Sequence, residues 1–350
     1  MIYYRLASIE DNQQLLELTS STGMPGRMAL RIDRYPNFFE LNKLRGKTNV
    51  YVAVENNLIV GSICVSDQRV YINQKEFPLF YISDFKVAKT HRNIGIGFQL
   101  TNEVVKYLES QNADFAFLNV SKGNKRPFVF FSDRSNYPDF QNIGIFKTFQ
   151  FIGSNKKIYP SKYKIEIAEG THEVLKFLNN YYSRHELASV ITRDEIEETN
   201  LFLVRKEKQI IAVMCIIDTM KMKQNVVLKL PLYLKLFLAF INGFSNLLQM
   251  SKLPKENEPI KMLYIKYLAV REYDKSLISM LISQAKQYAF NKSYSFVSIG
   301  LHERDPLIKK LPKFIRFTFY SVGMLVSMKD SKELMDKIKK GVPFKDYSIV

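Results

Sequence analysis

The sequence has few cysteines and no spacing typical of metal ligands. Its 350 residues include two cysteines, Cys64 and Cys215, and four histidines. Both cysteines lie in apolar, strand-like runs, where a thiol packs as a small hydrophobic side chain. We therefore expect no disulfide, a reducing compartment and no metal site, which excludes small disulfide-stapled folds and zinc-knuckle proteins.

The sequence also lacks a long uninterrupted apolar run. Its longest apolar region, residues 226–250, contains lysines, a proline, a glycine and asparagines, whereas a bilayer span needs about 20 apolar residues. We interpret it as a buried or partly buried helix that begins near Pro231. The open alternative is a helix with one face that contacts a membrane or an acyl chain, formed by Leu232, Leu236, Ala239 and Phe240. The N-terminus lacks the charged-then-apolar pattern of a secretory leader, so we expect a cytoplasmic protein.

Acidic residues are scarce relative to basic ones. The 51 Lys and Arg residues outnumber the 34 Asp and Glu residues and give a formal net charge of +17. This charge would attract coenzyme A, nucleic acid or anionic lipid. The chain has no run of five or more basic residues and no aromatic–basic repeat, so we do not expect nucleic acid as the partner.

One stretch, Asp84 to Leu100, combines a strand, a glycine-containing turn and the start of a helix. The apolar strand ends at Val87, and the turn reads Arg92-x-x-Gly95-x-Gly97. Glycines let backbone approach a ligand, and the first N–H groups of a helix are unpaired donors at the positive end of its dipole. Arg92 adds a fixed positive charge. This pattern predicts a site for a phosphate group.

The elements around this turn follow a recognisable order. Apolar periodicity predicts a strand at residues 2–6, a helix at 9–20 and, after the break at residues 23–26, a second helical region that reaches Arg45. It then predicts a hairpin of strands 49–55 and 58–66, a strand at 79–88, a helix at 94–110 and a strand at 115–121. This order and the Arg-x-x-Gly-x-Gly motif resemble the GNAT-type N-acetyltransferase superfamily over roughly residues 2–153. The resemblance implies a coenzyme A-dependent acyltransferase domain.

The resemblance also implies which residues hold acetyl-CoA. Splayed strands in such families bind the pantetheine arm, the turn binds the pyrophosphate, and an asparagine after the next strand contacts the pantetheine. The matching positions here are Phe85, Val87, Arg92, Asn93, Ile94, Gly95, Ile96, Gly97 and Asn124. The family pattern continues with a small residue and then a tyrosine that protonates the thiolate. This chain has Pro127 and Phe131 there, and phenylalanine donates no proton. Water or Tyr137 could substitute.

Three further candidates follow from the residues themselves. Asp84 is a carboxylate in an apolar strand near the expected thioester, and it is either the catalytic base or a structural acceptor where the strands diverge. His91 has no visible acid partner, so we assign it no role. Arg27, Arg31 and Arg34 would form one basic stripe on a helix and favour an amine acceptor that carries carboxylate or phosphate, although a solvated surface is the commoner explanation for such a stripe.

The second half of the chain repeats the same order of elements. Strands at 162–168, 200–205, 209–218, 262–271 and 295–301 and helices at 171–182 and 273–290 match the first half. Its turn, residues 270–277, has no glycine and contains Glu272 and Asp274, so we expect a degenerate copy that does not bind coenzyme A in the same way. The sequence thus predicts an α/β fold with a mixed sheet in two tandem GNAT-like modules, residues 1–156 and 162–350.

The function expected from these observations is transfer of an acetyl group from acetyl-CoA to an amine of a small molecule or protein. Two alternatives stay open at this point. One is a tandem transferase that uses aminoacyl-tRNA or long-chain acyl donors. The other is a non-catalytic sensor or scaffold that binds the coenzyme, which Phe131 and the glycine-free second turn would explain.

Overall fold

The first module combines strands with one long helix and several shorter helices. The computed structural model describes the chain except for residues 22, 24–28, 125–138, 157–162 and 330. The elements of the first module are β1 (Ile2–Leu6), α1 (Asn12–Ser20), β2 (Ala29–Asp33), α2 (Glu40–Lys43), β3 (Lys47–Glu55), β4 (Leu58–Ile72), β5 (Lys75–Val87), α3 (Ile96–Ser110), β6 (Phe115–Ser121) and β7 (Asp139–Ile152).

The second module repeats this plan with insertions. Its elements are β8 (Ile165–Ala168), α5 (His172–Tyr182), β9 (Ala188–Ser189), α6 (Arg193–Glu197), β10 (Asn200–Lys206), β11 (Gln209–Asp218), β12 (Gln224–Lys229), α7 (Leu232–Gly243), α8 (Ser245–Leu248), β13 (Met262–Val270), α9 (Lys275–Asn291), β14 (Phe296–His302), α10 (Leu307–Lys310), β15 (Arg316–Ser327) and α11 (Lys332–Lys340).

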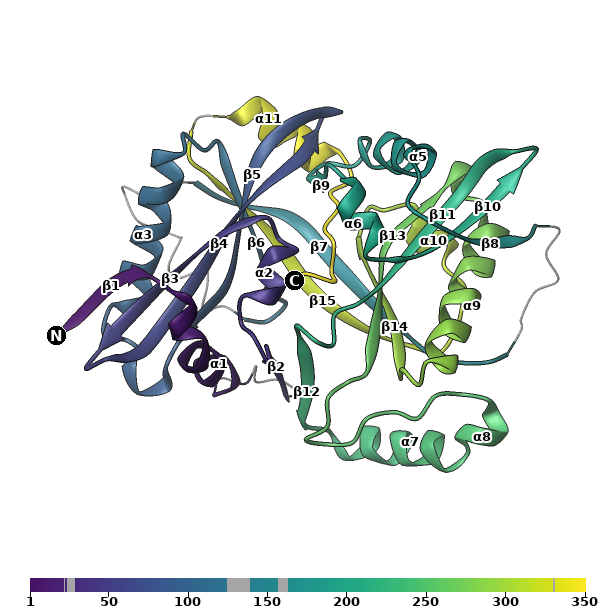
Figure 1. Ribbon diagram of the computed structural model, residues 1–350, viewed down its shortest axis with the longest axis horizontal. Coiled ribbons are helices and arrows are strands. Elements are labelled where there is room, and N and C mark those ends of the chain that lie inside the picture. Colours follow the sequence, from purple (N-terminus) through teal and green to yellow (C-terminus); the bar gives the residue numbers. More distant parts are fainter. Residues whose placement is uncertain (22, 24–28, 125–138, 157–162, 330) are drawn as a thin grey trace.

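The two modules share one continuous sheet. Its strand order is β1-β3-β4-β5-β6-β15-β7-β14-β13-β11-β10-β8, so β15 of the second module lies between β6 and β7 of the first. Strand β15 pairs antiparallel with both neighbours, and β7 pairs antiparallel with β14. Each module therefore contributes its last strand to the other, as the crossing ribbons in the middle of Figure 1 show. A second contact is the two-stranded sheet of β2 and β12.

Helices pack on both faces of the sheet. The buried side of α3 carries Ile96, Leu100, Val104 and Leu108, which pack on β4, β5 and β6. Burial of each such side chain contributes about 1.5–3 kcal/mol relative to exposure. Helix α9 packs similarly on β11, β13 and β14. The opposite face carries α1, α5 and α11 together with the C-terminal segment, residues 341–350, which ends between the modules in Figure 1.

Most predicted elements are confirmed, and one is wrong. The hairpin between β3 and β4 turns at Asn56 and Asn57, both in the left-handed region with φ of 49° and 64°, as an Asn-Asn turn favours. Helix α5 begins at Thr171, whose hydroxyl accepts from the Val174 N–H. The helical region predicted up to Arg45 is instead β2 followed by the single-turn helix α2. Pairing with β12 explains the difference, because it extends residues 29–33.

Candidate functional site

Strands β5 and β6 diverge in the middle of the first module. Their parallel pairing covers Phe80–Ile82 with Ala116–Leu118. A bulge follows in β5, since Cys64 of β4 lies opposite Ser83 while Ser62 lies opposite Lys86. Asp84 sits at this bulge in the left-handed region, with φ of 48°. The pairing of β5 with β6 ends at Ile82, so among the described residues the edge of β5 from the bulge to Val87 is not paired with β6, and we call it the open edge.

The open edge leads directly to the N-terminus of α3. Gly95 is its N-cap residue with φ of 91°, no side chain caps the helix, and a Cβ at Gly95 would meet nothing within 4 Å. Asn93 and Ile94 are exposed beside it, and Asn93 is also left-handed. Arg92 Nε donates to the Val87 carbonyl at 3.3 Å and lies at the same turn. The predicted loop residues therefore converge on one helix terminus that can receive an anion.

The other predicted coenzyme residues have different surroundings. Ile96 is 1% exposed and packs in the core under α3, so only its backbone is available to a ligand. Asn124 is exposed in the turn after β6. Pro127, Phe131 and Tyr137 lie outside the described residues. His91 has the acid partner that the sequence did not reveal, because its Nε2 lies 2.9 Å from Glu55 Oε2.

The equivalent helix terminus in the second module is closed. Asp274 is the N-cap of α9, and its Oδ1 accepts from the N–H groups of Ser276 at 2.7 Å and Leu277 at 3.2 Å. The carboxylate occupies the position that a phosphate would need. The backbone of β13 is also occupied, because the Tyr182 hydroxyl accepts from the Leu268 N–H at 2.8 Å. This geometry supports the expectation that the second turn does not hold coenzyme A.

Asp84 is the centre of a buried ion-pair cluster. Arg34 Nη1 lies 2.8 Å from Asp84 Oδ2, and Arg45 Nη1 donates to the same oxygen. The side chains of Arg34 and Arg45 are 1% and 2% exposed, and that of Asp84 is 14% exposed. Burial alone raises the pKa of Asp84, but the two guanidinium groups hold that pKa well below its usual range. A carboxylate so stabilised is a poor proton acceptor, which favours the structural alternative for Asp84.

The cluster ties the modules together. Arg45 Nε donates to the carbonyl of Ile349 at 2.7 Å. From the second module, Lys223 Nζ donates to the carbonyls of Ser348 at 3.1 Å and Val350 at 2.7 Å. Burial, and then the nearby arginines, lowers the pKa of Lys223 to about 7. Sequence reasoning missed Arg45 and Lys223, since neither has a local motif.

A buried tyrosine reaches the point where β5 and β6 diverge. The Tyr347 hydroxyl accepts from Asn119 Nδ2 at 2.8 Å and lies 2.5 Å from Ser321 Oγ. Asn119 directly follows Leu118, the last residue of β6 that pairs with β5. The ring packs against Gly300, where a Cβ would come within 2.1 Å of it. Burial raises the pKa of Tyr347, so its hydroxyl stays protonated near neutral pH.

The predicted basic stripe does not exist as a helix face. Arg31 lies in β2 and makes a two-pronged ion pair with Asp33 at 2.8 Å for each bond. Arg34 is buried against Asp84, as described above, and Arg27 lies outside the described residues. Both described arginines are neutralised by carboxylates of the protein. They therefore lend no support to an anionic acceptor.

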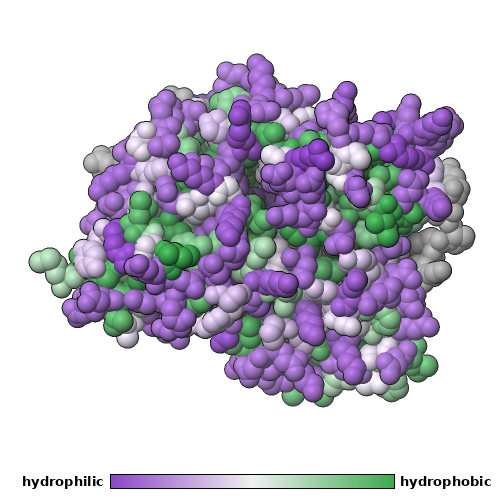
Figure 2. Space-filling model, in the orientation of Figure 1, coloured by the Kyte–Doolittle hydropathy of each residue, from purple (hydrophilic) through white to green (hydrophobic). Residues whose placement is uncertain are grey.

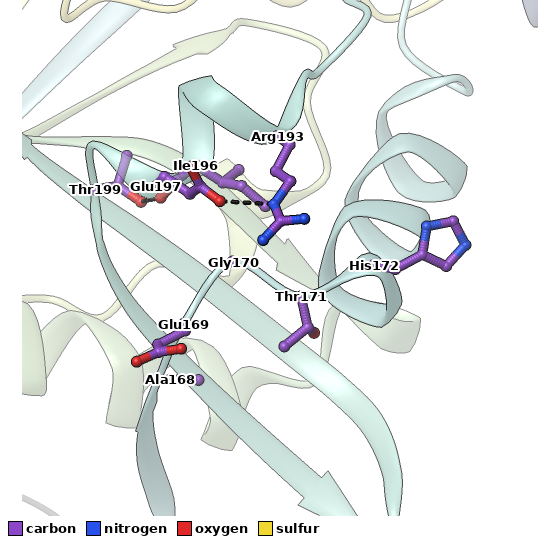
Figure 3. Close-up of a pocket in the computed structure, with 9 residues that line it drawn as sticks. All are labelled: Ala168, Glu169, Gly170, Thr171, His172, Arg193, Ile196, Glu197 and Thr199. Carbon is purple, nitrogen blue, oxygen red and sulfur yellow. Dashed lines mark hydrogen bonds and ion pairs between the residues drawn. The ribbon is translucent and has the colours of Figure 1, made fainter.

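Two hollows lie in the second module. One, of about 420 Å³, is lined by residues at the start of α5 and on α6 (Figure 3). There Arg193 pairs with Glu197 at 2.6 Å, and the His172 ring points away from the other side chains. The other, of about 490 Å³, lies beside α8. Among the described residues, no group of His, Cys, Asp and Glu could hold a metal ion.

Comparison with known proteins agrees with this geometry. Residues 4–124 match the family model described as an acetyltransferase (GNAT) domain. A comparison with curated protein sequences finds no match. Among solved structures, the N-myristoyltransferase of Saccharomyces cerevisiae with bound myristoyl-CoA is similar, with a TM-score of 0.61 and 12% identity over 97% of this chain and 88% of that chain. A GCN5-related N-acetyltransferase from Anabaena variabilis is also similar, with a TM-score of 0.53 and 11% identity over 93% of this chain and 72% of that chain.

These likenesses are structural, because the identities are low. They cover nearly the whole chain, so both modules and their shared sheet have counterparts in proteins of this fold. The matched residues 4–124 contain the diverging strands, the Arg92 to Gly97 turn and α3. Residues 4–124 thus match a GNAT acetyltransferase domain, and the second module repeats the fold of the first in tandem.

Proposed function

We propose that the protein is an acyl-CoA-dependent N-acyltransferase that uses acetyl-CoA to acylate an amine of a small molecule or a protein. The observation that carries the proposal is the contrast between the two modules. In the first, an open strand edge leads to a helix N-terminus without a side-chain cap, whereas Asp274 caps the equivalent terminus in the second.

The first module offers groups for each part of the donor. The edge of β5 at Phe85 and Val87 would pair with the amides of the pantetheine arm. Arg92 and the first N–H groups of α3 would bind the pyrophosphate, for which a helix terminus and a guanidinium are suited. The thioester would then lie near the end of the β5–β6 pairing. Backbone N–H groups there would polarise its carbonyl.

The reaction needs one proton removed and one supplied. The neutral amine attacks the thioester carbonyl, the C–S bond breaks, the amine nitrogen loses a proton to solvent water and the thiolate gains one from the acid. We assign the acid to Tyr347, a protonated hydroxyl bonded to Asn119 at the divergence of the strands. Asp84 is not assigned as the base, because the pKa of its carboxyl is lowered by Arg34 and Arg45.

One experiment distinguishes this proposal from its rivals. Calorimetry with coenzyme A and acetyl-CoA would measure binding, and thiol release across a panel of amines would measure turnover. Binding with turnover supports the proposal, and binding without turnover on any amine favours the sensor or scaffold. Absence of binding overturns the assignment of the site.

The chain length of the donor is a separate question. The likeness to an N-myristoyltransferase structure keeps a long-chain donor as the second candidate. Thiol release should therefore be measured with acyl-CoA thioesters from two to fourteen carbons. A higher kcat/KM for the longer thioesters would replace acetyl-CoA as the donor. Turnover only with an aminoacyl-tRNA would move the protein to that class.

A further inference from the structure

Helices α7 and α8 have apolar side chains on two faces. The inner face packs against β12, β13 and the segment between α8 and β13. It does so through Leu234, Leu238, Ile241 and Leu248. The outer face is exposed and consists of seven large apolar residues, which we call the apolar ridge: Leu232, Tyr233, Leu236, Phe237, Phe240, Phe244 and Leu247. A helix in contact with water normally has a polar outer face.

The ridge is strongly exposed and continuous. Leu232 is 73% exposed, Leu236 64%, Phe240 58% and Leu247 79%. The rings of Phe240 and Phe244 contact each other across the junction of α7 and α8, with centroids 4.9 Å apart. The two helices lie along the lower edge of the molecule in Figure 1, and hydrophobic atoms emerge along the same edge in Figure 2. A continuous patch of this kind marks an interaction surface.

The charges around the ridge are mainly positive, and the acidic residues beside it are Glu256 and Glu258. Residues 219–255, which include both helices, contain six lysines, of which Lys223 is buried away from the ridge, and the flanking residues Asp218 and Glu256 are acidic. Lys229, Lys252 and Lys255 are exposed close to the helices, and Lys235 on α7 pairs with Glu256 at 2.9 Å. Leucine and aromatic residues bordered by lysines are typical of helices that lie in the interface of an anionic membrane.

This charge pattern also bears on which partner the ridge contacts. A second copy docked through the same ridge would bring these lysines toward one another, and like charges oppose such an interface. An anionic bilayer satisfies both features at once, because its interior accepts the ridge and its headgroups attract the lysines. No described helix is long and apolar enough to cross a membrane, so the contact would be peripheral.

We propose that α7 and α8 dock the protein on an anionic phospholipid bilayer, with the apolar ridge inserted among the lipids and the nearby lysines at the headgroups. The surface belongs to the second module, whereas the diverging strands and the α3 terminus belong to the first. Membrane docking is therefore separable from coenzyme binding in an experiment.

The test uses the full chain and sedimentation with vesicles. One set of vesicles is phosphatidylcholine alone, and the other is an equal mixture of phosphatidylcholine and phosphatidylglycerol. The ridge variant is Leu236→Asp with Phe240→Asp, and its control is Ile167→Asp, an 82% exposed apolar residue on β8. The charge variant changes Lys229, Lys252 and Lys255 to Gln. Its control makes the same change at the exposed residues Lys47, Lys206 and Lys309.

The proposal predicts strong binding of the unchanged protein to the mixed vesicles and weak binding to phosphatidylcholine alone. The ridge variant should bind the mixed vesicles at least tenfold more weakly, while Ile167→Asp binds as the unchanged protein does. Each lysine near an anionic membrane surface strengthens binding about fivefold. The charge variant should therefore bind the mixed vesicles about 100-fold more weakly, and the affinity of its control should fall much less.

Two measurements make a negative result informative. Circular dichroism and calorimetry with coenzyme A should show that the ridge variant is folded and binds its ligand unchanged, because the substituted residues are exposed. The proposal is overturned if the unchanged protein does not bind the mixed vesicles, or if the ridge variant binds them equally well. It is also overturned if ultracentrifugation shows a dimer that Leu236→Asp dissociates, since a second copy would then cover the ridge.

Discussion

The difference between the two helix termini can be tested by transferring one residue type. Gly95 is the N-cap of α3, and Asp274 is the N-cap of α9. The substitution Gly95→Asp would give the first module the carboxylate that closes the second. A Cβ at Gly95 meets no neighbour within 4 Å, so the new side chain fits without a clash. Its cost is the left-handed backbone with φ of 91°, which Asp and Asn tolerate better than other residues.

The expected magnitude follows from charge. A carboxylate about 4 Å from a phosphate oxygen is repelled by about 4 kcal/mol at an effective dielectric constant of 20, and solvent at this exposed turn reduces that value. The carboxylate would also accept the N–H groups that the pyrophosphate needs. We expect coenzyme A to bind about 30-fold to 1,000-fold more weakly to Gly95→Asp. Asn has the same shape as Asp and a similar strain in left-handed backbone, but it carries no charge. The affinity of Gly95→Asn for coenzyme A should therefore fall by about tenfold or less.

Isothermal titration calorimetry with coenzyme A on the three proteins measures this difference. Circular dichroism should show equal helix content, because residue 95 precedes α3 and a Cβ there meets no neighbour within 4 Å. Asp274→Asn in the second module should leave the affinity unchanged. Equal affinities of Gly95→Asp and Gly95→Asn would refute the assignment of the pyrophosphate to the α3 terminus.

Three further predictions concern stability and folding. Asp84→Asn leaves two buried arginines without a counter-ion and should lower the free energy of unfolding by about 3–5 kcal/mol in urea titrations at pH 7. Because the pKa of Asp84 is lowered in the folded state, its contribution to the free energy of unfolding should stay constant as pH falls to the ordinary pKa of a carboxyl group and should be lost only below it. A loss of stability from this residue that begins above pH 6 would contradict this prediction. The pKa of a lysine in the unfolded chain is about 10, whereas that of Lys223 in the folded protein is lowered to about 7. The unfolded state therefore binds more protons between these two values, and the melting temperature should rise with pH in this range. Lys223→Met should flatten the rise. Residues 1–156 alone should give no dispersed amide spectrum by NMR, whereas co-expression with residues 163–350 should restore one, because β15 lies between β6 and β7.

Local signals in the sequence predicted the local parts of the site. The turn from Arg92 to Gly97 and helix α3 lie where the motif and the apolar periodicity place them, because both depend on neighbouring residues. The Asn56-Asn57 hairpin is predictable for the same reason. These features gave the fold class and the expected coenzyme loop.

The remainder depends on contacts between distant segments. The spacing of Arg31 and Arg34 suits a helix face, but residues 29–33 pair with β12, nearly 200 positions later, and become a strand. In that strand Arg31 and Asp33 share a face and neutralise each other. The partners of Asp84, Arg34 and Arg45, are 50 and 39 residues before it, and no short motif joins them. The exchange of β7 and β15 has no sequence signal, since each strand would also suit its own module.

The exchange of strands gives the second module a role that its closed helix terminus does not suggest. Strand β6 forms one side of the divergence, and its other edge is paired along Ser121 to Phe115 with β15. Tyr347, which reaches Asn119 on β6, rests on Gly300 of β14. The second module therefore fixes both the position of β6 and the group that we assign as the acid. The turn of the second module is closed by Asp274, and the module nevertheless supports β6, one side of the divergence at which we propose that the donor binds.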